Sequence, residues 1–187
     1  MANVNDIPPG FDDYGLRANA VFRACLDALA RPGRTVALEP NLVAPAPLLP
    51  TAAAVLLALA DFETSYWLDP RLGSAATVDP FVRFHTGAKR TSATSDADFA
   101  LISDIAAMPE LANFKTGTPE FPDRSTTVIV QVDRVEASGL RFAGPGINGE
   151  VAFSTVPAIA NVTDQLMANR AMFPCGVDLI FVTATDI

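Results

Sequence analysis

Four arginines stand at predicted turns or element ends, where a guanidinium is well placed to bind an anion. Arg31 and Arg34 enclose the Pro-Gly pair of ARPGR, Arg83 lies in PFVRFHTG, and Arg124 lies in FPDRS. A guanidinium presents a planar fork of donors that matches phosphate or carboxylate oxygens. If these arginines converge at one edge of a sheet, they form a polyanion site. If they are dispersed, each is more simply explained as a surface ion pair.

A second set of residues has the chemistry of bases or metal ligands. His85 is the only histidine; because imidazole titrates near neutral pH, it is a candidate general base, the alternative being a structural histidine at a strand end. Asp61, Glu63 and Asp69 flank or lie in the segment DFETSYWLD. The carboxylates at 61 and 63 are of the kind that holds Mg²⁺, or they are solvated charges near a helix end. One histidine completes neither a Ser-His-Asp set nor a histidine-rich metal set, so we expect no metal site.

The glycine-rich stretch GPGINGE, residues 144–150, raises the question of a phosphate-binding loop. It lacks the Lys-Ser/Thr of a P-loop and the third glycine of a dinucleotide fingerprint. Pro145 also removes one backbone N–H that a phosphate cradle would use. The local sequence therefore predicts a tight turn that leaves a strand.

Composition limits the classes of function. The net charge is −8 and the pI is about 4.5, which argues against nucleic-acid binding and against adhesion to anionic membranes. The longest apolar run, AAAVLLALA, is far shorter than the ~20 residues that span a bilayer, and the first 15 residues do not have the pattern of a secretory signal. Cys25 and Cys175 lie in no CxxC motif, so we expect a cytoplasmic protein without disulfides.

The elements that must position these residues follow from apolar spacing. Val21, Phe22, Cys25, Leu26 and Leu29 predict a helix over 14–30 that ends before Pro32. An apolar segment at 51–61 predicts a buried helix. Ser95 and Asp98 resemble a capping box at the start of a helix that extends to about residue 106. Residues 107–125 are predicted to form a long loop, and residues 157–172 another helix. Strands are predicted over 34–38, 65–68, 80–87, 126–132 and 177–183, with a hairpin turn at 138–139.

Alternating helices and strands predict an α/β fold, a three-layer sandwich with helices on both faces of the sheet. The runs TTVIVQV and VDLIFVT are continuous and rich in β-branched residues, which is typical of strands covered on both faces. The hairpin expected within 126–143 makes the predicted sheet mixed. No linker divides the chain, so we expect one domain over 1–187, with a flexible N-terminal segment at 1–12.

Six motifs in order resemble one known family. The motifs are FRACLDALARPGR (22–34), DFET (61–64), FHTGA (84–88), FPDRSTTVIV (121–130), FAGPGI (142–147) and FPCGVDLIFV (173–182). Together they resemble the H subunit of the bacterial carbon–phosphorus lyase system, which handles phosphonates. The resemblance extends over residues 22–182.

This resemblance implies a cytoplasmic homodimer whose fold is similar to the large domain of pyridoxal-phosphate-dependent transferases. It implies a complex with the G, I and J subunits. With G, I and the L protein, the family is implicated in transferring ribose triphosphate from MgATP to an alkylphosphonate, with release of adenine. MgATP is then a substrate of the complex. A pyridoxal-phosphate enzyme needs a Schiff-base lysine, and only Lys89 and Lys115 are present, both in predicted loops. We therefore expect no pyridoxal phosphate and no other cofactor on this chain.

The resemblance assigns motif positions but no catalytic residue. One hypothesis is a subunit that binds MgATP or phosphonate through an Arg/His edge; another is a non-catalytic assembly subunit; a third, outside the family, is an unrelated α/β nucleotide-binding domain. Convergence of Arg31, Arg83 and Arg124 favours the first and dispersal favours the second. The candidates for substrate or anion binding are Arg31, Arg34, Glu63, Arg83, His85 and Arg124, and the motif loops supply Gly33, Thr86, Gly87, Asp123, Ser125, Gly144 and Gly146.

Overall fold

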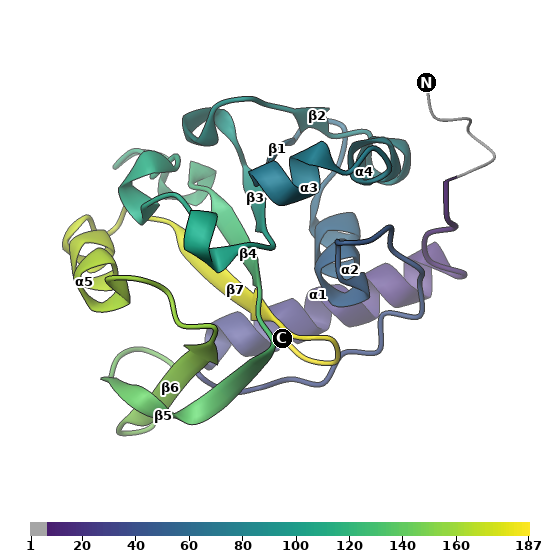
Figure 1. Cartoon of the computed structure of the whole chain (residues 1–187). Coiled ribbons are helices and arrows are strands. Elements are labelled where there is room, and N and C mark those ends of the chain that lie inside the picture. The colour runs from purple at the N-terminus through teal and green to yellow at the C-terminus, as the bar shows by residue number, and fades with distance from the viewer. Residues whose placement is uncertain (1–6) are drawn as a thin grey trace.

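The computed structural model describes residues 7–187 and has a five-stranded parallel sheet at its centre (Figure 1). The strand order is β2-β1-β3-β4-β7, and all four neighbouring pairs are parallel. The predicted strands at 65–68, 126–132 and 177–183 are confirmed as β1, β4 and β7. The strands are β1 (Ser65–Leu68), β2 (Lys89–Arg90), β3 (Phe99–Ile102), β4 (Thr127–Gln131) and β7 (Asp178–Val182).

A separate two-stranded sheet is formed by β5 (Arg134–Phe142) and β6 (Val151–Val156), which pair antiparallel. The prediction of a mixed sheet was therefore wrong, because the antiparallel strands form their own ribbon beside the parallel sheet. The hairpin turn expected at 138–139 was also wrong. Gly139 lies within β5 at a shift of register between Glu136 and Leu140, with φ +89°. The actual turn between β5 and β6 is GPGINGE, as its sequence predicts.

Two predicted helices are confirmed. α1 (Tyr14–Ala30) begins where the Asp13 side chain accepts a hydrogen bond from the Leu16 N–H, and it ends at Arg31, before Pro32. α2 (Pro50–Leu59) is buried at every position from 51 to 57 because it is apolar around its whole circumference. In the part of the chain that the structure describes, no helix is both long and apolar enough to span a membrane.

The segment 80–87, predicted as a strand, is instead part of helix α4 (Val78–Thr86). Its apolar residues also fit helical spacing, because Val78, Phe81 and Val82 are buried on one side. Pro80 lies in the first turn and Gly87 follows the last residue in the left-handed conformation, φ +72°. Proline near a helix start and glycine just after its end are the usual termination signals, and they outweigh the two-residue alternation.

The predicted helix after Ser95 was also wrong. Only residues 94–96 form a short 3₁₀ turn, and β3 then runs between β1 and β4. The Asp98 carboxylate accepts hydrogen bonds from the Ser65 N–H and hydroxyl, both at 2.7–2.8 Å, so it ties β3 to β1 instead of capping a helix. The predicted strand at 34–38 is reduced to one isolated bridge between Ala37 and Asp186. Residues 107–125 form a loop as predicted, with three short 3₁₀ turns around it and Leu111 and Phe114 buried.

Helices cover both faces of the parallel sheet, so the molecule has the predicted three layers (Figure 1). On one face α1, α2, α3 (Pro70–Ser74) and α4 enclose a core that includes Tyr66, Leu101 and Ile129. On the other face α5 (Val162–Ala171) and the 3₁₀ turns cover Val128 and Val130. The helix predicted from 157 begins five residues later.

The N-terminal segment is described from residue 7 onward. The expected flexible segment at 1–12 falls partly on residues 1–6, which lie outside the described residues. Ile7 and Phe11 pack against the core on the α1–α4 side. The His85 Nε2 atom donates a 2.9 Å hydrogen bond to the Pro8 carbonyl oxygen. From Ile7 onward, the segment is therefore held against α4.

The carboxyl ends of β1 and β3 are joined by an internal carboxylate. The chain leaves β1 toward β2 on one side and later returns to β3 on the other side. Open α/β sheets usually bind ligands at such a reversal of strand order, outside the carboxyl ends of the strands. Asp69 directly follows β1 and is fully buried. It accepts hydrogen bonds from the Ser103 N–H (2.5 Å), the Asp104 N–H (2.8 Å), the Leu72 N–H (2.7 Å) and the Ser103 hydroxyl (3.0 Å). This carboxylate joins the two strand ends and caps α3.

Candidate functional site

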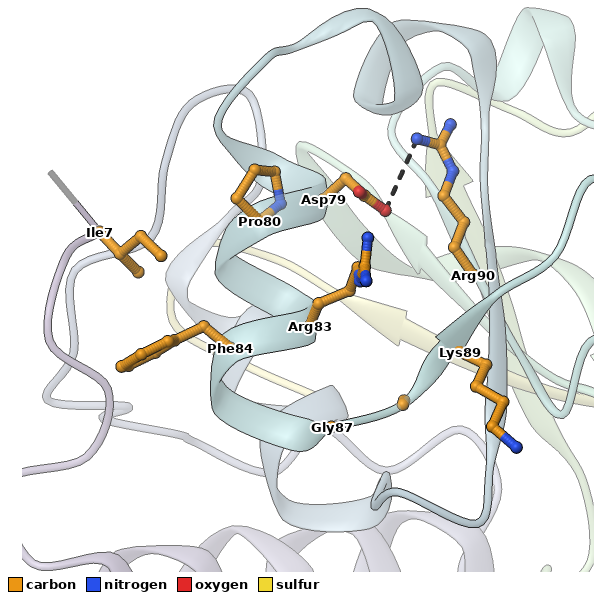
Figure 2. A pocket seen from close by; sticks show the side chains of 9 residues that line it. Ile7, Asp79, Pro80, Arg83, Phe84, Gly87, Lys89 and Arg90 are labelled. Atoms are coloured by element: carbon orange, nitrogen blue, oxygen red, sulfur yellow. Dashed lines mark ion pairs between the residues drawn. The ribbon is translucent and has the colours of Figure 1, made fainter. Parts of the chain in front are cut away.

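A pocket between α4 and β2 collects three cationic side chains (Figure 2). Its volume is about 670 Å³. Arg83 comes from α4, whereas Lys89 and Arg90 form β2 at the edge of the sheet. The lining residues are Ile7, Asp79, Pro80, Arg83, Phe84, Gly87, Ala88, Lys89 and Arg90.

Local structure explains why these residues meet. Asp79 and Arg83 are four positions apart, so they lie one above the other on the same face of α4. Gly87 ends the helix and reverses the chain; a Cβ there would lie 3.2 Å from the Phe62 Cβ atom, besides being strained at positive φ. The Thr86 hydroxyl donates to the Val82 carbonyl oxygen at 2.8 Å and accepts from the Ala88 N–H at 3.0 Å, which fixes this turn. The chain then pairs with β1 and brings β2 beside the helix.

In the part of the chain that the structure describes, Asp79 is the single carboxylate in the lining of this pocket, and it has two partners. The Tyr66 hydroxyl donates a 2.7 Å hydrogen bond to Asp79 Oδ1, and Arg90 Nη1 lies 3.6 Å from the same oxygen. Burial, together with the neighbouring Asp79 carboxylate, raises the pKa of Tyr66 well above its ordinary value. Tyr66 therefore remains protonated and is a permanent donor to Asp79.

The other two cations have no such partner. Within residues 7–187, neither Arg83 nor Lys89 forms an ion pair with a carboxylate. All three cationic residues are exposed, so they remain accessible to a ligand. In Figure 2 the Arg83 side chain points toward the side on which Asp79 and Arg90 pair, while Lys89 points away at the edge of the pocket. Among residues 7–187, the lining of the pocket thus carries three positive charges and one negative charge.

His85 does not line this pocket. Its ring contacts the Phe81 and Phe84 rings, with centroids 4.6 and 5.0 Å apart, and its Nε2 atom bonds to the Pro8 carbonyl oxygen. A Cβ at Gly10 would lie 2.9 Å from the His85 Nδ1 atom, so the N-terminal segment passes directly over the imidazole. This geometry fits the structural alternative for His85 better than a general base.

Arg31 and Arg34 lie elsewhere, at the carboxyl end of α1. Both pair with Asp27, Arg34 at 3.6 Å, and both side chains are more than half exposed. They lie next to the GPGINGE turn, because a Cβ added to Gly146 would collide with the Ala30 carbonyl oxygen. Two glycine turns that are 110 residues apart in sequence therefore pack against each other.

These two turns border a second cavity of about 640 Å³. Gly33 lies against Val151, since a Cβ at this glycine would be 2.7 Å from the Val151 Cγ1 atom. The cavity lies between α1, the β5–β6 ribbon, α5 and β7, and most of its lining is apolar. It includes Gly33, Arg34 and Gly144 among the motif residues, but not Arg31, Arg83 or Arg124.

Arg124 and Glu63 occupy two further places. Arg124 ends a 3₁₀ turn, Pro122–Arg124, and its guanidinium lies over the Phe121 ring at 4.2 Å from the centroid. Asp123 belongs to the same turn, and Ser125 forms an isolated bridge with Thr116. Glu63 is exposed in the loop after α2, where its N–H donates to the Asp61 carboxylate.

The structure therefore does not bring the four predicted arginines together. Arg31 and Arg34 share Asp27, Arg83 lines the pocket at α4, and Arg124 packs on Phe121. The expected Arg/His edge is not formed. Sequence reasoning missed Asp79, Lys89 and Arg90, because 80–87 was interpreted as a strand. With a helix over 78–86, the spacing of Asp79 and Arg83 and the following Lys-Arg pair would have predicted this pocket.

The side chains that line this pocket have the chemistry of an anion-binding site. Guanidinium and ammonium groups bind phosphate or carboxylate oxygens through charge-assisted hydrogen bonds. Across residues 7–187, no three His, Cys, Asp or Glu side chains are grouped so that they could hold a metal ion. Asp69, which follows the Asp61–Glu63 pair considered for Mg²⁺, accepts four hydrogen bonds from the protein itself.

Comparisons with a family model and with two related proteins agree on the family of this chain. Residues 9–187 match the family described as "Bacterial phosphonate metabolism protein (PhnH)". The chain is 39% identical over 171 residues to "Alpha-D-ribose 1-methylphosphonate 5-triphosphate synthase subunit PhnH" of Rhizobium meliloti (strain 1021), covering 91% of this chain and 85% of that protein. It is 30% identical over 180 residues to "Putative C-P lyase subunit protein HtxG" of Stutzerimonas stutzeri, covering 91% and 81%. The resemblance drawn from the six motifs is confirmed, and the chain belongs to the PhnH family of bacterial phosphonate metabolism proteins.

Proposed function

We propose that the chain is the H subunit of an α-D-ribose 1-methylphosphonate 5-triphosphate synthase. In this role it acts in the cytoplasm with the G, I and L proteins, and the complex transfers ribose triphosphate from MgATP to an alkylphosphonate with release of adenine. The observation that carries the proposal is the 39% identity, over 91% of the chain, to a relative named as that subunit. Family membership leaves the third hypothesis, an unrelated nucleotide-binding domain, without support.

Within that complex we infer an accessory role for this subunit. The dispersal of Arg31, Arg83 and Arg124 supports the non-catalytic hypothesis over a catalytic Arg/His edge. The hydrogen bonds that engage Asp69 at the carboxyl ends of β1 and β3 support it too, because this position is the common ligand site of such sheets. The subunit then contributes surfaces and an anion-binding pocket, while the reacting groups come from its partners.

A homodimer that also binds the G, I and J subunits fits the surface of α1. Only part of the apolar surface of this helix is buried within the molecule, at Val21 and Cys25. Phe22, Leu26 and Leu29 are 43%, 51% and 45% exposed. An apolar stripe of this kind is typical of a surface covered by another chain. Light scattering of the isolated chain should give twice the 19.7 kDa mass, and a monomer at micromolar concentration would contradict the dimer.

The proposal includes a fold shared with pyridoxal-phosphate-dependent transferases but no pyridoxal phosphate. Lys115 is engaged in an ion pair with Asp98 at 2.5 Å, which leaves Lys89 as the lysine to test. Purified protein mixed with the cofactor should form no Schiff base that borohydride can reduce. A borohydride-stable adduct at Lys89 would contradict this part of the proposal.

The proposed assembly can be tested by co-expression. The chain should co-purify with its G, I and J proteins from the same operon, and a strain without it should fail to grow on an alkylphosphonate as the only phosphorus source. Growth should return with the wild-type chain. Normal growth of the deletion strain, or no recovery of the chain with these partners, would overturn the proposed function.

A further inference from the structure

The pocket between α4 and β2 is an unusual feature in a chain whose net charge is −8. Three of its 13 basic residues line this one cavity, and Asp79 is the single acid that residues 7–187 contribute to the lining. A group of like charges is unfavourable unless counter-charges or solvent screen it. Arg83 and Lys89 have no carboxylate partner within residues 7–187, so their charge remains available to an external anion.

The Asp79–Arg90 pair is weak enough to be exchanged. At 3.6 Å the two atoms are beyond normal hydrogen-bond distance, and the Arg90 side chain is 39% exposed. A partly exposed ion pair of this kind contributes little to the stability of the fold. Asp79 would not be left without a partner if Arg90 moved, because Tyr66 also donates to it at 2.7 Å.

We propose that this pocket binds a multiply charged phosphate chain, with Arg83 and Arg90 as its main ligands and Lys89 at the edge. In this arrangement Asp79 competes with the ligand for Arg90, and binding of the phosphate chain transfers Arg90 from Asp79 to the phosphate oxygens. The identification of the natural ligand as the triphosphate part of a nucleotide or of its ribosyl product rests on the proposed function. Binding of a phosphate chain to the isolated subunit does not.

Size and chemistry favour such a ligand. A volume of about 670 Å³ lies within the range of small-molecule sites, about 300–1,000 Å³. Two guanidinium groups can each bind one phosphoryl group of a phosphate chain, whereas a ligand with a single carboxylate would engage only one of them. Phe84, which is 57% exposed, and Pro80 give one side of the pocket an apolar surface beside the cations. An organic group attached to the phosphate chain could pack on this surface.

Calorimetric titration of the isolated chain with inorganic tripolyphosphate tests the proposal. Arg83→Gln and Arg90→Gln should each weaken binding by about tenfold or more, as expected for the loss of a charge-assisted contact. Arg23→Gln is the matched control: it removes the same charge from an exposed arginine on α1, outside the pocket. Its affinity should stay within about twofold of the wild type.

The substitution Asp79→Asn should raise the affinity for tripolyphosphate, whereas the two arginine substitutions should lower it. Asparagine keeps an oxygen that accepts from Tyr66 but removes the charge that competes for Arg90, so tripolyphosphate should bind several-fold more tightly. A merely structural disturbance would weaken binding. Melting curves of each variant establish that the protein is folded.

Three outcomes would overturn the proposal: no binding of tripolyphosphate at millimolar concentration, equal weakening by Arg23→Gln and Arg83→Gln, or weaker binding by a folded Asp79→Asn variant. A parallel titration with ATP distinguishes the two sources of the phosphate chain. If ATP and tripolyphosphate bind with equal affinity, the pocket recognises the phosphates alone. If ATP binds more tightly and Phe84→Leu abolishes this difference, the pocket also contacts the base or the ribose. If the subunit supports growth on phosphonate but binds no tripolyphosphate, this inference fails and the proposed function stands.

Discussion

The Tyr66 hydroxyl on β1 donates a 2.7 Å hydrogen bond to the Asp79 carboxylate in the first turn of α4. This bond connects the parallel sheet to the helix that carries Arg83, and it orients the carboxylate that competes for Arg90. The side chain of Tyr66 is fully buried, whereas Asp79 faces the pocket. A core residue therefore sets the charge arrangement of the proposed binding site.

Tyr66→Phe removes this bond but keeps the ring in the core. We expect the free energy of unfolding to fall by about 1.5–3 kcal/mol, the usual contribution of a hydrogen bond to a charged group. Urea denaturation measures the change. Tyr14→Phe is the control, because the Tyr14 hydroxyl makes a longer bond of 3.2 Å to the Leu57 carbonyl oxygen and the residue is 56% exposed. Equal losses in the two variants would contradict a special role for the Tyr66–Asp79 bond.

Asp69→Ala should be among the most destabilising substitutions in the chain. It leaves the N–H groups of Leu72, Ser103 and Asp104 and the Ser103 hydroxyl without their acceptor. Because an unsatisfied buried donor costs about 1–3 kcal/mol, we expect a loss of about 3 kcal/mol or more. Asp123→Ala, in an exposed 3₁₀ turn, should change stability by no more than about 0.5 kcal/mol. A small effect at Asp69 would mean that water replaces the carboxylate.

Gly146→Ala tests the contact between the two glycine turns. Gly146 and Gly149 have nearly the same positive φ, +81° and +79°, so alanine at either position should cost about 1–2 kcal/mol of backbone strain. Only at Gly146 would the new Cβ collide with the Ala30 carbonyl oxygen, since nothing lies within 4 Å of the corresponding position at Gly149. Thermal melts should therefore show a clearly larger loss for Gly146→Ala. Equal losses would place the GPGINGE turn away from α1.

The two cysteines should differ in reactivity and in their effect on alkaline stability. Burial raises the pKa of the Cys25 thiol to about 11 from an ordinary value of 9, so iodoacetamide should modify the half-buried Cys175 first. A raised pKa in the folded state stabilises the protein fully below pH 9, and this contribution is lost as the pH rises through about 11. Unfolding measured at pH 8 and 11 should show a smaller decrease for Cys25→Ala than for Cys175→Ala. Rapid alkylation of Cys25 in the folded protein would contradict its burial.

How far the sequence predicts this fold depends on which signals compete at each segment. The strands at 126–132 and 177–183 could be predicted because continuous β-branched runs have no good helical alternative. The segment 80–87 could not be predicted in this way, because its apolar residues fit both the two-residue period of a strand and the 3.6-residue period of a helix. Pro80 and Gly87 are the residues that favour the helix. At 99–102, the capping pattern of Ser95 and Asp98 concealed a buried strand whose partners, β1 and β4, are distant in sequence.

The same error explains the incomplete prediction of the site. Arg83 was identified, but its neighbours Asp79, Lys89 and Arg90 become neighbours only when 78–86 is a helix and β2 pairs with β1. Spatial convergence of Arg31 and Arg124 with Arg83 could not be judged without the fold. Tertiary contacts place these three arginines in separate surroundings.

The most direct test of the central claim is adenine release by the reconstituted complex. Purified G, I and L proteins are incubated with MgATP and an alkylphosphonate, with and without this chain, and free adenine is measured by chromatography. Adenine and the ribosyl triphosphate product should form at a substantial rate only when the chain is present. The same rate of adenine release in its absence would contradict the assignment of this chain as the H subunit of the synthase.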